Sequence, residues 1–128
     1  MTKCIMTVDD AVTMRNMITF TLRTTGYEIV GASDGVAALD VLKTRQVDLV
    51  ITDINMPRMD GIELTRQIRA MPGYHAVPIL LLTTESHPEI KSQGRAAGAT
   101  GWIVKPFQPD QLLAIVAKVL PSPQLAHV

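Results

Sequence analysis

Short apolar runs alternate along the chain with longer segments that have helical spacing. The runs are rich in aliphatic residues and bounded by turn residues, which is typical of strands. They predict strands over Cys4–Val8, Tyr27–Ala32, Leu49–Asp53, Pro78–Thr83 and Gly101–Pro106. After each run, apolar residues recur every three or four positions, which predicts a helix. The helices are expected over about 12–24, 36–42, 61–70, 86–98 and 110–120.

Regular alternation of strands and helices predicts an α/β fold, with a doubly wound parallel sheet that helices cover on both faces. Pro78–Thr83 is almost wholly apolar, so we expect this strand to be buried on both faces. Tyr27–Ala32 alternates only partly, which indicates a strand at an edge. The first helix should turn Met17, Ile18 and Leu22 toward the sheet.

All ten predicted elements lie within residues 1–120, which we expect to form one domain. Residues 121–128 include two prolines and are expected to form a flexible C-terminal tail. We expect no attached output domain, so this domain should act through a separate partner or by its own chemistry.

Composition argues against several classes of partner. Lys plus Arg number 12 and Asp plus Glu also number 12, so no net charge attracts nucleic acid or an anionic membrane. No apolar run approaches membrane-spanning length, and Asp9 follows the N-terminus too soon for a signal peptide. Cys4 is the single cysteine, which is typical of a reducing compartment. We expect a cytoplasmic monomer that binds neither nucleic acid nor membrane.

Polar residues stand where the predicted strands end. The residues at these ends are Asp9, Asp10, Asp53, Thr83 and Lys105. Parallel α/β sheets bind ligands at the carboxyl ends of their strands, so we expect these side chains to meet in one crevice. The loop after Asp53 contains Pro and Gly and should display that carboxylate. A structural alternative is that Asp53 only begins a turn.

Three carboxylates in one crevice repel one another unless a hard divalent cation lies among them. Mg²⁺ is suited to such oxygen ligands. Thr83 offers a hydroxyl donor and Lys105 a compact positive charge, and together with the metal they would neutralise a phosphoryl group. Asp53 is then the expected nucleophile, forming an acyl phosphate.

The ordered set Asp9-Asp10, Asp53-Ile54-Asn55-Met56-Pro57, Thr83 and Lys105-Pro106-Phe107 resembles the signature of response-regulator receiver domains. The resemblance extends to about Leu120 and is greatest to stand-alone chemotaxis regulators of the CheY type. It implies a flavodoxin-like sheet of five parallel strands in the order 2-1-3-4-5, covered by five helices.

The resemblance also implies roles for individual residues. Asp53 would accept a phosphoryl group from a histidine kinase of the CheA type. Asp10, Asp53 and the backbone carbonyl of Asn55 would bind Mg²⁺, with Asp9 acting partly through water. Thr83 and Lys105 would hold the phosphoryl oxygens. The Lys105–Pro106 peptide bond is expected to be cis.

In this family a threonine and an aromatic residue switch together after phosphorylation, and Thr83 and Trp102 occupy those positions. The surface of the fourth helix, fifth strand and fifth helix would then bind a flagellar motor switch or another downstream protein. Asn55 and Glu85 lie two residues beyond Asp53 and Thr83, where relatives tune dephosphorylation. Trp102 replaces the usual tyrosine or phenylalanine, and its alternative role is that of a core anchor.

Other functions stay open at this level. A phosphate sink or a phosphorelay intermediate would use the same residues as a motor regulator. A covalent-aspartate phosphatase would usually have a second Asp where this chain has Asn55. A flavin-binding module shares the architecture, but acids at the strand ends would repel a flavin phosphate. We therefore expect a phosphoacceptor switch with self-catalysed phosphorylation and dephosphorylation, and not an enzyme.

Overall fold

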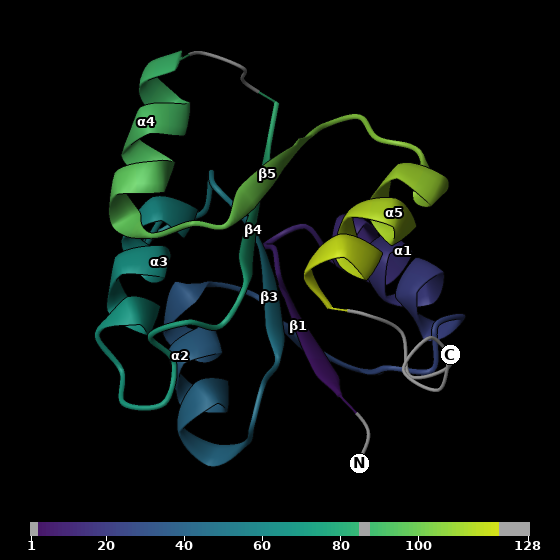
Figure 1. Ribbon diagram of the computed structural model, residues 1–128, viewed down its shortest axis with the longest axis horizontal. Coiled ribbons are helices and arrows are strands. Elements are labelled where there is room, and N and C mark those ends of the chain that lie inside the picture. The colour runs from purple at the N-terminus through teal and green to yellow at the C-terminus, as the bar shows by residue number, and fades with distance from the viewer. Residues whose placement is uncertain (1–2, 85–87, 121–128) are drawn as a thin grey trace.

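The computed structural model describes residues 3–84 and 88–120, and their arrangement confirms the predicted doubly wound α/β fold (Figure 1). Five parallel strands pair in the order β2-β1-β3-β4-β5. The strands are β1 (Cys4–Val8), β2 (Glu28–Ala32), β3 (Leu49–Asp53), β4 (Ile79–Thr83) and β5 (Gly101–Val104). The helices are α1 (Val12–Arg23), α2 (Gly35–Thr44), α3 (Gly61–Arg69), α4 (Pro88–Ala97) and α5 (Pro109–Val119). None of these helices is long and apolar enough to cross a membrane.

The sheet separates two layers of helices, with α2, α3 and α4 on one face and α1 and α5 on the other (Figure 1). Side chains alternate along each strand, so each strand supplies both cores. In β1, Met6 packs into the core under α2 and α3, whereas Ile5 packs into the core under α1 and α5. Burial on both faces explains why β1, β3 and β4 are almost continuous apolar runs.

Several boundaries differ from the sequence predictions. β5 ends at Val104, so Lys105 follows the strand, and its N–H donates to the Thr83 carbonyl at 2.7 Å. The buried side of α1 consists of Ile18 and Leu22, whereas Met17 is 38% exposed, so its predicted burial is wrong. The predicted start of the fourth helix, at 86–87, and the predicted tail, 121–128, lie outside the described residues.

Tyr74 fixes the connection that leads into the central strand β3. Its buried hydroxyl lies 2.8 Å from the carbonyl oxygen of Arg45 and 3.3 Å from that of Leu42, and it accepts the Val47 N–H at 3.3 Å. The Tyr74 hydroxyl, from the α3–β4 connection, therefore bonds both to carbonyl oxygens at the end of α2 and to the N–H of Val47, just before β3.

We predict that Tyr74→Phe lowers the free energy of unfolding by about 1–3 kcal/mol, because the buried Val47 N–H loses its partner. Urea unfolding followed by circular dichroism measures this change. Tyr27→Phe is the matched control: among the described residues the Tyr27 hydroxyl makes one bond, to the Leu120 carbonyl at 2.6 Å, so its removal should have a smaller effect. Equal stability of Tyr74→Phe and the wild-type chain would contradict this role.

Candidate functional site

Asp53 is held at the end of β3 by a loop whose ends are fixed. The N–H of Gly61 donates to the carbonyl of Ile54 at 2.8 Å, and a Cβ at position 61 would collide with the carbonyl oxygen of Asp53. Only glycine therefore permits this close approach of two backbone segments. Asp60 begins α3 by accepting the Glu63 N–H at 2.8 Å. The sequence thus fixes the exit of the chain from Asp53 at both ends.

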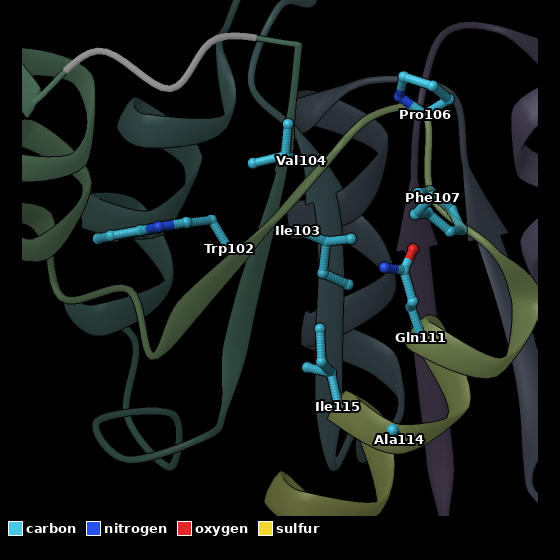
Figure 2. Close-up of a pocket in the computed structure, with 8 residues that line it drawn as sticks. All are labelled: Trp102, Ile103, Val104, Pro106, Phe107, Gln111, Ala114 and Ile115. Atoms are coloured by element: carbon cyan, nitrogen blue, oxygen red, sulfur yellow. The ribbon is translucent and has the colours of Figure 1, made fainter.

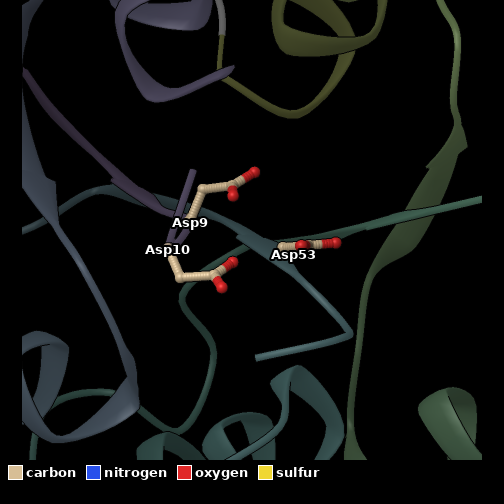
Figure 3. A group of neighbouring side chains, drawn as sticks. All are labelled: Asp9, Asp10 and Asp53. Atoms are coloured by element: carbon tan, nitrogen blue, oxygen red, sulfur yellow. The ribbon is translucent and has the colours of Figure 1, made fainter. Parts of the chain in front are cut away.

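Three carboxylates meet at the carboxyl ends of β1 and β3, as the sequence predicts. One oxygen from each of Asp9, Asp10 and Asp53 lies within 4.8 Å of the others. The three side chains extend to the same side of the sheet edge (Figure 3). Asp9 and Asp53 are buried, with exposed fractions of 1% and 6%, whereas Asp10 is exposed.

Lys105, directly after β5, and Thr83, at the end of β4, lie at the same edge of the sheet. The Lys105 ammonium lies 3.1 Å from Asp53 Oδ1 and forms an ion pair in which both side chains are largely buried. Thr83 is buried at the end of β4. The Lys105–Pro106 peptide bond is cis, as expected. Asp53 is more buried than its position at the end of a strand suggested, and it lies beside this ammonium.

The Asp9 carboxylate is only partly satisfied by hydrogen bonds. Its Oδ1 accepts the Ala11 N–H at 2.9 Å, but its buried Oδ2 has no hydrogen-bond partner in the described part of the chain. Burial raises the pKa of Asp9, as do the charges of Asp53 and Asp10, while the Ala11 N–H and Lys105 oppose this rise. An unsatisfied carboxylate oxygen facing two further carboxylates fits a hard divalent cation, which accepts such oxygen ligands.

Trp102 lies on β5, half-buried between the sheet and α4. The Lys91 ammonium lies 5.7 Å and the Arg95 guanidinium carbon 5.6 Å from the centre of its ring. Both distances are within the range of cation–π attraction. The indole therefore has two cations of α4 beside it.

A groove of about 500 Å³ follows the outer edge of β5 and reaches α5. Figure 2 shows Trp102 extending from β5 toward α4, while Ile103 extends to the opposite side, toward α5. Phe107, Gln111 and Ile115 complete much of the lining. A mainly apolar surface thus adjoins the indole.

The comparison with known proteins identifies the family. A family model described as the response regulator receiver domain matches residues 5–117, which include β1 from Ile5 onward, the other four strands and the acidic cluster. The chain belongs to the response-regulator receiver family. It is a CheY-like receiver domain of two-component signalling, a system in which such receivers act with histidine kinases and downstream targets.

Curated relatives of this receiver include chemotaxis proteins. It is 40% identical over 118 residues to a chemotaxis protein CheY homolog of Campylobacter jejuni, covering 91% of this chain and 91% of the relative. It is 34% identical over 126 residues to the alkaline phosphatase synthesis transcriptional regulatory protein PhoP of Bacillus subtilis. That match covers 98% of this chain but spans about half of PhoP, 52%.

Solved structures support the same assignment. The receiver is similar to the chemotaxis protein CheY4 of Vibrio cholerae, with a TM-score of 0.91 and 43% identity, covering 94% of this chain and 100% of that one. It is also similar to the receiver domain of the sensor histidine kinase PA1611 from Pseudomonas aeruginosa, with a TM-score of 0.86 and 28% identity. This match covers 95% of our chain and 100% of the other, whose active-site cleft coordinates a magnesium ion.

The other predicted site residues are less completely placed. Asn55 is exposed in the loop that follows β3, and Glu85 lies outside the described residues. The sequence alone assigns no role to Lys91 and Arg95, or to Arg58, which pairs with Asp34. Lys91 and Arg95 are four residues apart on the helix before Trp102, and this spacing indicates that they lie on one face of that helix. Nothing in the sequence indicates the partner of Arg58.

We predict that Asp9→Asn stabilises the receiver in metal-free buffer at neutral pH, by about 1 kcal/mol, because it removes one charge from a crowded buried site. The raised folded-state pKa means that the folded chain retains this proton more strongly than the unfolded chain does. Wild-type stability should therefore fall as the pH rises from the unfolded pKa through the raised folded pKa.

Thermal unfolding of both proteins across this pH range measures the effect. Asp40→Asn is the matched control, because Asp40 lies at an exposed site on α2 and pairs with Lys43, and it should leave stability nearly unchanged. An Asp9→Asn variant less stable than the wild-type receiver without metal would contradict the prediction.

Proposed function

We propose that this receiver is a phosphorylation switch in which Asp53 accepts a phosphoryl group from a histidine kinase. The observation that carries the proposal is the position of Asp53, buried between two further carboxylates and the Lys105 ammonium at 3.1 Å. A structural ion pair alone would not require Asp9 and Asp10 to lie beside the same carboxylate.

The residues divide the chemistry among them. An Asp53 carboxylate oxygen forms the new O–P bond as the P–N bond to the kinase histidine breaks. Asp9, Asp10, Asp53 and the backbone carbonyl of Asn55 would hold Mg²⁺, which when bound supplies positive charge against the phosphoryl oxygens. Lys105 and the Thr83 hydroxyl then hold oxygens of the transferred group.

The same contacts supply a switch. A phosphoryl group on Asp53 draws the Thr83 hydroxyl toward its oxygens, and the chain after β4 moves with it. Trp102 then changes rotamer, and the surface formed by α4, β5 and α5 takes a different shape. The half-buried position of the indole and the groove beside it support this choice of surface.

Asn55 and Glu85 are proposed to line the path of the water that hydrolyses the acyl phosphate. Their polar side chains orient that water, so the phosphorylated form should be short-lived. An aspartyl phosphate that persists for many hours in the wild-type chain would contradict this part of the proposal.

The chemotaxis relatives favour a kinase of the CheA type and a flagellar motor switch, or another downstream protein, as partners. We further propose that residues 1–120 constitute the receiver and that it acts in the cytoplasm as a monomer. A phosphate sink or relay intermediate is the second candidate, because its phosphoacceptor site would be the same.

We predict that Asp53→Asn abolishes labelling by acetyl phosphate in the presence of Mg²⁺, because the amide is not a competent nucleophile. Intact-protein mass spectrometry measures labelling. Asp60→Asn is the matched control: it lies in the same loop, and its side-chain oxygen still caps α3, so labelling should persist. Full labelling of Asp53→Asn would refute the assignment of the phosphoacceptor.

We also predict that Trp102, the single tryptophan of the chain, changes its fluorescence when acetyl phosphate and Mg²⁺ are added, and that Asp53→Asn abolishes this change. The double variant Lys91→Ala/Arg95→Ala should shift emission toward the phosphorylated value even without phosphate, because each cation stabilises the observed ring position beside α4 by roughly 0.5–1 kcal/mol. The double variant Lys43→Ala/Arg66→Ala, which removes two cations at exposed sites on α2 and α3, is the charge-matched control. Unchanged emission of the wild-type chain on phosphorylation would indicate that Trp102 is only a core anchor.

A further inference from the structure

The loop between β3 and α3 is attached to the start of α2 at two neighbouring points. The Arg58 guanidinium forms an ion pair with the carboxylate of Asp34. The adjacent Met59 packs against Gly35 so closely that a Cβ at position 35 would collide with its side chain. The side chains of Asp34, which precedes α2, and Arg58, in the loop, are thus joined directly.

Asp34 is a well-anchored partner for this contact. Its Oδ1 accepts the Ala37 N–H at 2.9 Å and so begins α2, while its Oδ2 binds Arg58. Only 9% of the Asp34 side chain is exposed, whereas 67% of the Arg58 side chain is exposed. The carboxylate is therefore fixed by the helix, and the flexible arginine reaches across to it.

The backbone of Arg58 also indicates that contacts determine its conformation. Its φ of 68° lies in the left-handed region, which is unfavourable for residues with a Cβ and is usually occupied by glycine or asparagine. Such conformations persist where the surrounding contacts hold them. An arginine here is consistent with a requirement for its side chain.

The strand order shows which strand lies between the two attached segments. β1 lies between β2 and β3, so a contact between the residues that follow β2 and β3 spans the sheet edge where β1 ends. That edge carries Asp9 and Asp10. The Arg58–Asp34 pair thus joins the segments that follow the two strands on either side of β1, and the loop segment between Asp53 and Arg58 carries Asn55.

We propose that Arg58 and Asp34 form an ionic clasp that positions the β3–α3 loop for Mg²⁺ binding. Arg58 is a positioning residue, since it acts through the loop and its Asn55 carbonyl. The inference rests on the proposed function, in which that carbonyl is a metal ligand. A loop that is already held does not need to be ordered when the cation binds, so the clasp strengthens binding.

The test is the Mg²⁺ affinity of the full chain, measured by isothermal titration calorimetry. Arg58→Ala should bind Mg²⁺ roughly tenfold more weakly, the size typical of losing a residue that orients a metal ligand. Arg58→Gly should bind weakly too, although glycine relieves the left-handed backbone. Arg58→Lys keeps a cation and should retain most of the affinity.

A double-variant cycle tests the pairing itself. Asp34→Asn keeps an oxygen to begin α2 but removes the charge, and it should weaken binding. Combined with Arg58→Ala, it should add little further loss, because both changes remove one contact. Arg66→Ala is the charge-matched control: it removes a cation that pairs with Glu63 at an exposed site on α3, and affinity should not change. Thermal unfolding without metal verifies that each variant is folded.

The outcomes separate the two proposals. Wild-type affinity in Arg58→Ala, or fully additive losses in the double variant, would overturn the clasp while leaving the proposed function intact. Wild-type affinity in Arg58→Gly with weak binding in Arg58→Ala would also overturn it, because the backbone conformation alone would then explain the loss. A wild-type chain that binds no Mg²⁺ would overturn both the proposed function and the clasp that rests on it.

Discussion

Repulsion among three carboxylates is the constraint that organises this receiver. Their oxygens lie within 4.8 Å of one another, and two of the three side chains are buried. Such a cluster is unfavourable unless positive charge is brought to it. Lys105 supplies one charge and the Ala11 N–H one hydrogen bond, but Asp9 Oδ2 still has no partner among the residues described. The arrangement therefore fits a cation site of the kind that receiver domains have at their acidic cluster.

The surroundings of the cluster combine rigid and adjustable parts. β1 and β3 are central strands paired on both sides, and Gly61 and Asp60 fix the exit from Asp53. Trp102, by contrast, lies half-buried beside two cations and an open groove. A rigid site holds reacting groups in a fixed geometry. A weakly held side chain such as Trp102 allows a small change at that site to alter the surface around β5. The Arg58–Asp34 pair belongs to the rigid part, because it joins the loop to a helix.

Sequence reasoning was sufficient for the sheet and for the meeting of the acidic side chains at one edge of it. Central strands buried on both faces require continuous apolar runs, so their ends could be located, and parallel strands bring those ends to one edge. Asp9, Asp10, Asp53 and Lys105 were therefore placed together before any coordinates. The family resemblance supplied the strand order, which the pattern of runs does not specify.

What the sequence did not reveal depends on long-range geometry. Arg58 meets Asp34 across 24 positions through a backbone conformation that its residue type does not predict. The sequence placed Lys105 near Asp53, but it did not show that the Asp53 side chain would be buried. On α1, Phe20 is 76% exposed although apolar, and no contact in the described chain explains why.

The most direct test of the central claim is a titration of Mg²⁺ into the wild-type chain, at constant ionic strength maintained with a monovalent salt. The account predicts one saturable site per chain at millimolar concentrations, accompanied by a rise in thermal stability. It also predicts that Asp10→Asn, which removes an exposed ligand, greatly weakens this site. Absence of saturable binding, or equal stabilisation by the monovalent salt, would contradict the account.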